Sequence, residues 1–174
     1  MKLRDFKEKD AELMLEWMHS ELSQKVFAKD FNNFTKDKVL NFIKNAKNYE
    51  NQIHLACVDD NDNYLGTISL KNIDDENKNA EYAVSFHEKA FGTGASTYAT
   101  KEILRIAFEE LKLQKVYLNV LDINGRANAF YKKIGFKKVG TFYNHILKSD
   151  GYKNLVWYEM QKEEYKKIEK VRNV

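Results

Sequence analysis

The chain has 174 residues, of which 43% are hydrophobic and 32% are charged, and its formal net charge at pH 7 is +3. This length suits one domain with its own core, and so weak a net charge gives no argument for a nucleic-acid partner. The first residues, MKLRDFKEKD, are too polar for a secretion signal, and no stretch approaches the roughly 20 apolar residues of a membrane helix. We therefore expect a cytoplasmic protein with neither nucleic-acid nor membrane partners.

Hydrophobic periodicity predicts the elements of the first half of the chain. Asp10 and Thr35 are suited to cap the two helices there, and Gly66 is expected to form a bulge within a strand. The expected elements are a strand at 2–6, a helix at 10–18, a helical turn within 20–27, a helix from Thr35 to about Ala46, and strands at 52–58, 64–72 and 80–86.

The second half of the chain alternates helices and strands. The strand at 115–121 is apolar on both faces, which is typical of a central position in a sheet. The other expected elements are a long helix from Gly94 to Leu111, a helix at 124–134 ended by Gly135, and a hairpin of strands at 136–147 and 152–160. Together these elements predict one α/β domain with a mixed sheet over residues 1–162. Residues 163–174 form a charged tail, either a frayed helix or a disordered segment.

A glycine-rich segment, KAFGTGAST, stands directly before the long helix. Gly92 and Gly94 let the backbone approach a ligand closely, and the first N–H groups of a helix attract anions. Polar groups around these glycines come from Lys89, Thr93 and Ser96. The segment suits a pyrophosphate, and the alternative is a glycine turn that binds nothing.

A second motif, NGRANAFYKKIGF, occupies residues 124–136. It places Asn124, Ala127 and Tyr131 on one face of a helix, and Asn124 is suited to cap that helix. The alternative is a face of the core with a tyrosine hydroxyl that is satisfied internally.

Together the two segments resemble the GNAT N-acetyltransferase superfamily. Its cofactor loop, Q/R-x-x-G-x-G/A, is matched by KAFGTG, residues 89–94, and its second signature, N-x-x-A-x-x-x-Y-x-x-x-G-F, is matched at every spacing by residues 124–136. Two positions depart from the family pattern. Lys89 replaces Gln or Arg and lacks the planar fork of arginine, and His87-Glu88 replaces the common His-Pro before the loop.

This resemblance implies a single-domain acyl-CoA N-acyltransferase fold, with a central mixed sheet flanked by helices, and acetyl-CoA as the acetyl donor. The backbone of 84–86 would pair with the pantetheine arm, residues 91–96 would hold the pyrophosphate, and a homodimer is expected. The implied cofactor-binding residues are Val84, Ser85, Phe86, Lys89, Phe91, Gly92, Thr93, Gly94, Ala95, Ser96, Asn124 and Tyr131.

Acetyl transfer to an amine needs a neutral amine and a protonated leaving thiol. Tyr131 is the predicted general acid, because the pKa of a phenol, about 10, is close to that of a thiol. Glu81 is the predicted base, directly or through water, and the alternative for it is an ordinary surface charge. His87 is a second candidate base, although it lies on the cofactor side of the loop.

The acceptor expected from the resemblance is a small primary amine, either a nucleotide-linked amino sugar or a polyamine. Acidic residues that are able to attract a polyamine, or to serve only as solvated turn charges, are Glu21, Asp30, Asp74, Asp75 and Glu76. The alternatives are the N-terminus of a ribosomal protein as acceptor, or an acyl-CoA-binding sensor without catalysis. Cys57 is expected to be a buried thiol, and neither it nor the four histidines show the spacing of a metal site.

Overall fold

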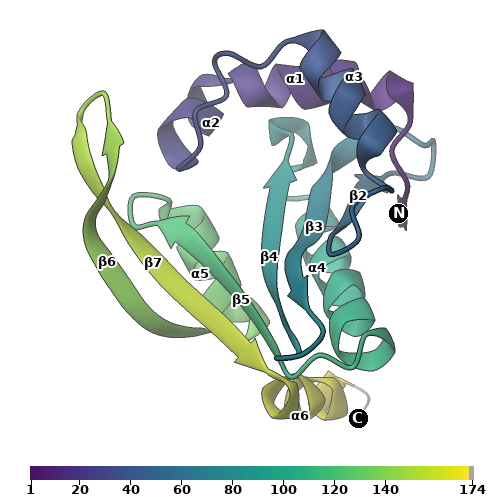
Figure 1. Cartoon of the computed structure of the whole chain (residues 1–174), viewed down its shortest axis with the longest axis vertical. Helices are drawn as coiled ribbons and strands as arrows, with labels where there is room; N and C mark the ends of the chain where they lie inside the picture. Colours follow the sequence, from purple (N-terminus) through teal and green to yellow (C-terminus); the bar gives the residue numbers. More distant parts are fainter. Residues whose placement is uncertain (173–174) are drawn as a thin grey trace.

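A seven-stranded sheet organises the chain in the computed structural model, which describes residues 1–172 (Figure 1). Its order is β1-β2-β3-β4-β5-β7-β6, and β4 and β5 are the parallel pair among otherwise antiparallel neighbours. The predicted α/β class with a mixed sheet is therefore confirmed. The strands are β1 (Lys2–Arg4), β2 (Ile53–Val58), β3 (Tyr64–Asp74), β4 (Asn79–Phe86), β5 (Lys115–Leu121), β6 (Lys137–Lys148) and β7 (Gly151–Gln161).

Six α-helices of the described chain accompany the sheet, together with short 3₁₀ turns at Glu8–Asp10 and Glu88–Ala90. A π-helical turn, Ile106–Glu110, continues α4, so the long helix predicted to reach Leu111 is present with a widened last turn. The helices are α1 (Ala11–His19), α2 (Glu21–Val26), α3 (Lys36–Asn45), α4 (Ala95–Arg105), α5 (Gly125–Ile134) and α6 (Lys162–Arg172).

The predicted helix caps have different outcomes. Thr35 caps α3, because its Oγ1 accepts a hydrogen bond from the Lys38 backbone N–H at 3.3 Å. Asp10 stands at the N-cap position of α1 but makes no capping bond, so that prediction is wrong. Its carboxylate instead accepts from both terminal nitrogens of Arg4, at 2.7 and 2.9 Å, and from the Lys7 backbone N–H at 2.8 Å. Bonds to Arg4 and Lys7, six and three residues earlier in the chain, have taken the group that capping of α1 would have used.

Helices cover both faces of the sheet, as the alternation along β2 shows. Ala56 and Val58 belong to a core with α1 and α3, whereas Cys57 between them belongs to the core under α4. In Figure 1, α1, α2 and α3 lie together at one end of the molecule and α6 lies at the other. Cys57 is fully buried, as predicted.

The charged tail begins as a packed helix rather than a disordered segment. Tyr165 on α6 stacks on Phe108 with ring centroids 4.9 Å apart, and its hydroxyl donates to Glu109 Oε1 at 2.6 Å. Residues 173–174 of the predicted tail lie outside the described residues.

The two parallel strands diverge soon after they meet. β4 and β5 pair only from Asn79 to Glu81, opposite Lys115 to Tyr117, so the rest of β4 has no partner on that side. The β2–β3 pairing has a bulge at Leu65, one residue before Gly66, where the bulge was expected. Gly66 itself sits against the far end of β4. A Cβ there would lie 2.5 Å from the Phe86 ring, which explains the glycine. The gap between β4 and β5 is the place where the sheet can admit a ligand.

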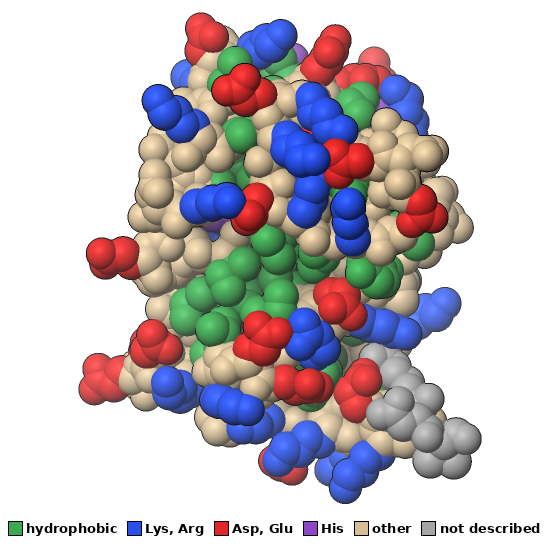
Figure 2. Space-filling model, turned by 90° about the vertical axis from the view of Figure 1, so that its right-hand side faces the viewer, with side chains coloured by type: hydrophobic (Ala, Val, Ile, Leu, Met, Phe, Trp, Pro, Cys, Tyr) green, Lys and Arg blue, Asp and Glu red, His purple; other side chains and the backbone are tan. Residues whose placement is uncertain are grey.

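Charges of both signs are interspersed on the face shown in Figure 2, around a group of hydrophobic side chains. That face has no large patch of one sign. Within residues 1–172, no helix has the length and apolar character needed to cross a membrane.

Candidate active site

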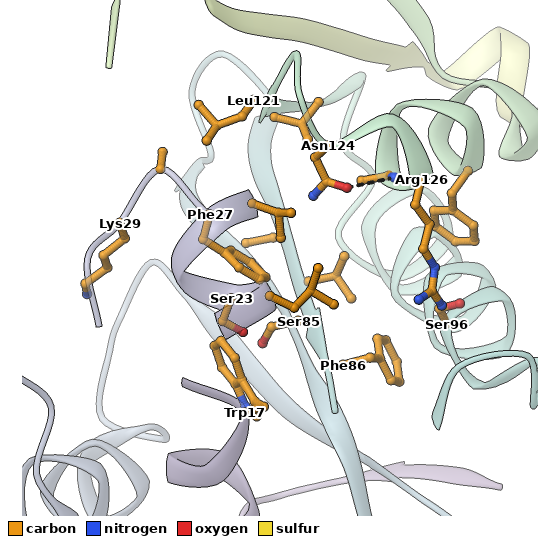
Figure 3. Close-up of a pocket in the computed structure, with 18 of the residues that line it drawn as sticks. Trp17, Ser23, Phe27, Lys29, Ser85, Phe86, Ser96, Leu121, Asn124 and Arg126 are labelled. Carbon is orange, nitrogen blue, oxygen red and sulfur yellow. Dashed lines mark hydrogen bonds between the residues drawn. The ribbon is translucent and has the colours of Figure 1, made fainter. Parts of the chain in front are cut away.

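A cavity of about 710 Å³ occupies the gap between β4 and β5 and reaches both faces of the sheet. Glu81 and Ser69 line it on the face that carries α1 and α3, and Phe130 and Tyr131 of α5 line it on the other. In Figure 3, Trp17 and Phe27 stand on the opposite side of the cavity from Asn124. The cavity is therefore open to both faces of the sheet, so that ligands bound on opposite faces can meet in it.

The glycine loop has the geometry that its sequence predicts. Gly92 and Gly94 adopt φ of 79° and 84°, the left-handed region that favours glycine, and a Cβ built on either would meet nothing within 4 Å. Within the described chain, the backbone N–H groups of Gly92, Gly94, Ser96 and Thr97 have no hydrogen-bond partner. Because these donors lie at the N-terminus of α4, the loop fits an anionic group such as a pyrophosphate.

Thr93 serves the loop itself rather than offering its hydroxyl to a ligand. Its Oγ1 donates to the carbonyl of Ala90 at 2.7 Å and accepts from the N–H of Ala95 at 3.3 Å. Ser96, one residue into α4, lines the cavity.

Asn124 holds the start of α5. Its Oδ1 accepts from the Ala127 N–H at 3.1 Å, which confirms the predicted cap, and Asn124, Ala127 and Tyr131 all line the cavity. Asn128 was not singled out by its sequence, yet its amide donates to the carbonyls of Leu121 and Asn124, at 3.0 and 2.8 Å. Asn128 thereby fixes the start of α5 to the end of β5.

Tyr131 is 7% exposed, and its ring packs edge-on against Tyr82 with centroids 6.0 Å apart. Its hydroxyl makes no hydrogen bond with any residue of the described chain, unlike that of Tyr82, which lies 2.8 Å from Thr100 Oγ1. Burial raises the pKa of the Tyr131 hydroxyl above its ordinary value. Tyr131 thus presents a hydroxyl to the cavity that no described residue of the chain hydrogen-bonds.

Glu81 lies at the point where β4 and β5 part. Its carboxylate forms an ion pair with Lys71 Nζ at 2.9 Å and accepts from Asn72 Nδ2 at 3.0 Å, and its side chain is 18% exposed. His87, the second candidate base, is buried outside the cavity, with its Nε2 3.3 Å from Glu16 Oε1. Of the two candidate bases, only Glu81 lines the cavity.

Lys89 also lies outside the cavity. Its side chain is 69% exposed, and its Nζ lies 3.3 Å from Glu16 Oε1. The predicted site residues that line the cavity are Glu81, Val84, Ser85, Phe86, Phe91, Ser96, Asn124 and Tyr131, and those that do not are Lys89, Gly92, Thr93, Gly94 and Ala95.

The half of the cavity away from the loop is lined by α2, by residues 27–29 and Phe31, and by the polar face of β3, and is called the acceptor half below. None of the five acidic residues considered as polyamine attractants lines it. Asp74, for example, accepts from Asn77 at 2.7 Å in the β3–β4 turn. The charged residues that line the cavity include Lys25, Lys29 and Lys71 and the carboxylates of Glu81 and Glu88, and Lys71 is the lysine paired with Glu81.

A sheet that opens between two parallel strands, with an anion cradle at the helix that follows the first, defines a nucleotide-cofactor transferase site. Acetyl-CoA fits it, because the free N–H groups suit its pyrophosphate and the unpaired edge of β4 suits the amides of its pantetheine arm. Among residues 1–172, no three side chains of the His, Cys, Asp or Glu type lie together as metal ligands.

Comparison with known proteins identifies the family. A family model described as the acetyltransferase (GNAT) domain matches residues 1–137. The chain therefore belongs to the GNAT family of acetyl-CoA-dependent N-acetyltransferases.

The individual relatives resemble this chain at low sequence identity and over only part of its length. The chain is 31% identical over 100 residues to a putative ribosomal N-acetyltransferase, YdaF of Bacillus subtilis, a match covering 58% of this chain and 55% of the relative. It is 29% identical over 91 residues to the spermidine N(1)-acetyltransferase of Escherichia coli, covering 52% and 49%. The chain thus spans about half the length of these curated relatives.

Among solved structures, a Vibrio cholerae spermidine N-acetyltransferase in complex with CoA and spermine aligns with a TM-score of 0.85 at 18% identity, covering 94% of this chain and 96% of that one. A structure of a probable acetyltransferase aligns with a TM-score of 0.78 at 26% identity, covering 93% of both chains. The first of these likenesses shows a shared fold.

Proposed function

We propose that this enzyme acetylates the primary amine of a small molecule that also carries negative charge, of the class of nucleotide-linked amino sugars. The observation that carries the proposal is the charge of the acceptor half. Lys25, Lys29 and Lys71 line the cavity, and of the two carboxylates that line it, Glu81 and Glu88, Glu81 is already paired with Lys71. A phosphate-bearing acceptor would meet cations there, whereas a polyamine needs several unpaired carboxylates.

The proposed chemistry is direct attack. The amine nitrogen forms a bond to the acetyl carbon, and the bond from that carbon to sulfur breaks. Glu81 receives a proton from the amine, directly or through water, and Tyr131 gives its proton to the departing sulfur. Backbone N–H groups on the free edge of β4 are suited to stabilise negative charge on the thioester oxygen as it develops.

A polyamine acceptor is the second candidate, and relatives named as spermidine acetyltransferases favour it. A ribosomal N-terminus is the third, favoured by the name of one relative. A sensor without catalysis is disfavoured by the presence of both Tyr131 and Glu81 in the cavity. The expected homodimer stays a prediction.

The test is release of free thiol from acetyl-CoA over a panel of nucleotide-linked amino sugars, spermidine, spermine and peptides with ribosomal-protein N-termini. The proposal expects the highest kcat/KM with an amino sugar that carries its nucleotide, and a large loss when the same sugar lacks the diphosphate. Fastest turnover of spermidine or of a peptide would refute the anionic acceptor, and binding of acetyl-CoA without turnover of any amine would favour the sensor.

A further inference from the structure

Arg126 is a cation at the mouth of the cavity that the sequence motifs leave unassigned. It is the second residue of α5, and its guanidinium carbon lies 3.2 Å from the centroid of the Phe91 ring. Phe91 directly precedes Gly92, so this contact joins α5 to the cofactor loop. In Figure 3 the Arg126 side chain extends from α5 toward Ser96 on α4.

No carboxylate of the described chain pairs with Arg126, and none accepts a hydrogen bond from it. Arg126 is nonetheless exposed at a cavity lined by Phe91 and Ser96. Contact with an aromatic face orients a guanidinium while its N–H donors, which point outward in the guanidinium's own plane, stay free. The five donors of this arginine are therefore presented beside the unpartnered N–H groups of the loop.

Lys89, the cation inside the loop motif, is differently placed. Its Nζ pairs with Glu16 of α1, and its side chain does not line the cavity. Glu16 is also the carboxylate beside His87, so this group of charges ties α1 to the loop. Lys89 thus has an anionic partner, whereas Arg126 has no anionic partner among residues 1–172.

We propose that Arg126, not Lys89, is the side-chain cation that binds a phosphate of coenzyme A. The proposal rests on the family's cofactor and not on the acceptor class, so it can succeed or fail independently of the proposed function. Coenzyme A offers two such groups, the pyrophosphate and the 3′-phosphate, and a guanidinium recognises either by paired N–H donors.

The test is calorimetric titration of the full chain with CoA and with dephospho-CoA, which lacks the 3′-phosphate. The variants are Arg126→Ala, Arg126→Lys and the control Lys89→Ala, which also removes an exposed cation near the loop. Because Arg126→Ala removes a charge-assisted hydrogen bond, it should weaken CoA binding by roughly tenfold or more. Lys89→Ala should change CoA affinity less than twofold. Arg126→Lys should weaken CoA binding by an amount between those of the other two variants.

The dephospho-CoA arm identifies the phosphate. An equal loss for both ligands in Arg126→Ala places the guanidinium at the pyrophosphate, and a loss confined to CoA places it at the 3′-phosphate. Wild-type affinity of Arg126→Ala for CoA would overturn the proposal, as would a larger loss in Lys89→Ala. Arg126 is exposed, so thermal unfolding should be unchanged and should confirm that each variant is folded.

Discussion

Lys71 and Glu81 form an ion pair across β3 and β4, with Nζ 2.9 Å from Oε1, at the last residue where β4 pairs with β5. The proposed base is thus held at the opening of the sheet by a neighbouring strand. The pair also raises the question of whether Glu81 is catalytic or only joins two strands.

Two variants separate these roles. If Glu81 accepts the proton of the amine, Glu81→Gln should lower kcat by roughly tenfold or more, a typical size for general base catalysis. Lys71→Met breaks the same ion pair but leaves the carboxylate, so it should keep most of the activity. Equal losses in both variants would show that the ion pair, and not the base, is what matters.

Gly92→Val should weaken acetyl-CoA binding, because its side chain would occupy the open space above the loop. The matched control is Gly151→Val in the β6–β7 turn, where φ is also positive, at 112°, and a Cβ also meets nothing within 4 Å. Both variants carry left-handed strain of roughly 1–2 kcal/mol, so they should unfold at similar denaturant concentrations. Undiminished acetyl-CoA binding in Gly92→Val would mean that the loop does not hold the cofactor.

Cys57 should be unreactive in the folded protein. Burial raises the pKa of its thiol to about 11, and the thiolate, which is the reactive form, is therefore scarce at pH 8. Alkylation by iodoacetamide at pH 8 should be roughly a hundredfold slower in the native protein than in urea, from the pKa difference alone. Similar rates in the two conditions would contradict the buried placement of this side chain.

Asp10 should be needed for stability rather than for the helix end. Its side chain is 1% exposed and is paired with Arg4, so Asp10→Asn removes the ion pair and leaves Arg4 with Asp62 as its remaining carboxylate partner. Losing charge-assisted hydrogen bonds in this way costs about 1.5–3 kcal/mol, measurable as a lower midpoint of urea unfolding. Asp60→Asn is the control, because Asp60 pairs with the N-terminus but is 91% exposed, and its midpoint should not move.

Much of the fold was predictable because it depends on local chemistry. Thr35 and Asn124 cap helices through atoms three residues away, and Gly92 and Gly94 occupy backbone conformations that few other residues tolerate. Because these requirements involve only residues close together in the chain, the sequence alone can reveal them.

The placement of cations was not predictable in the same way. Lys89 and Arg126 are both near a glycine loop in three dimensions, and only the position of Glu16, on a helix far away in the chain, separates their roles. Asp10 shows a different limit: the helix end and Arg4 are both close to it in sequence, and only the structure shows that its carboxylate bonds Arg4. Much of the wall of the acceptor half comes from α2 and the residues after it, where the sequence predicted no more than a helical turn and gave no sign of a binding site.

The pH profile offers a check on the role of Tyr131. Burial raises the pKa of its hydroxyl, so the proton-donating form is present at every pH below that raised value and is lost only above it. Wild-type kcat should therefore show no fall up to about pH 10, the ordinary pKa of a phenol. A fall in kcat centred near pH 8 that disappears in Tyr131→Phe would contradict this assignment.

The most direct test of the account is kcat of Tyr131→Phe with the best acceptor, measured beside the affinity of the same variant for acetyl-CoA. The ring stays and only the proton donor is removed, so we predict that kcat falls by roughly tenfold or more while acetyl-CoA affinity is nearly unchanged. Wild-type turnover in this variant would remove Tyr131 from the mechanism.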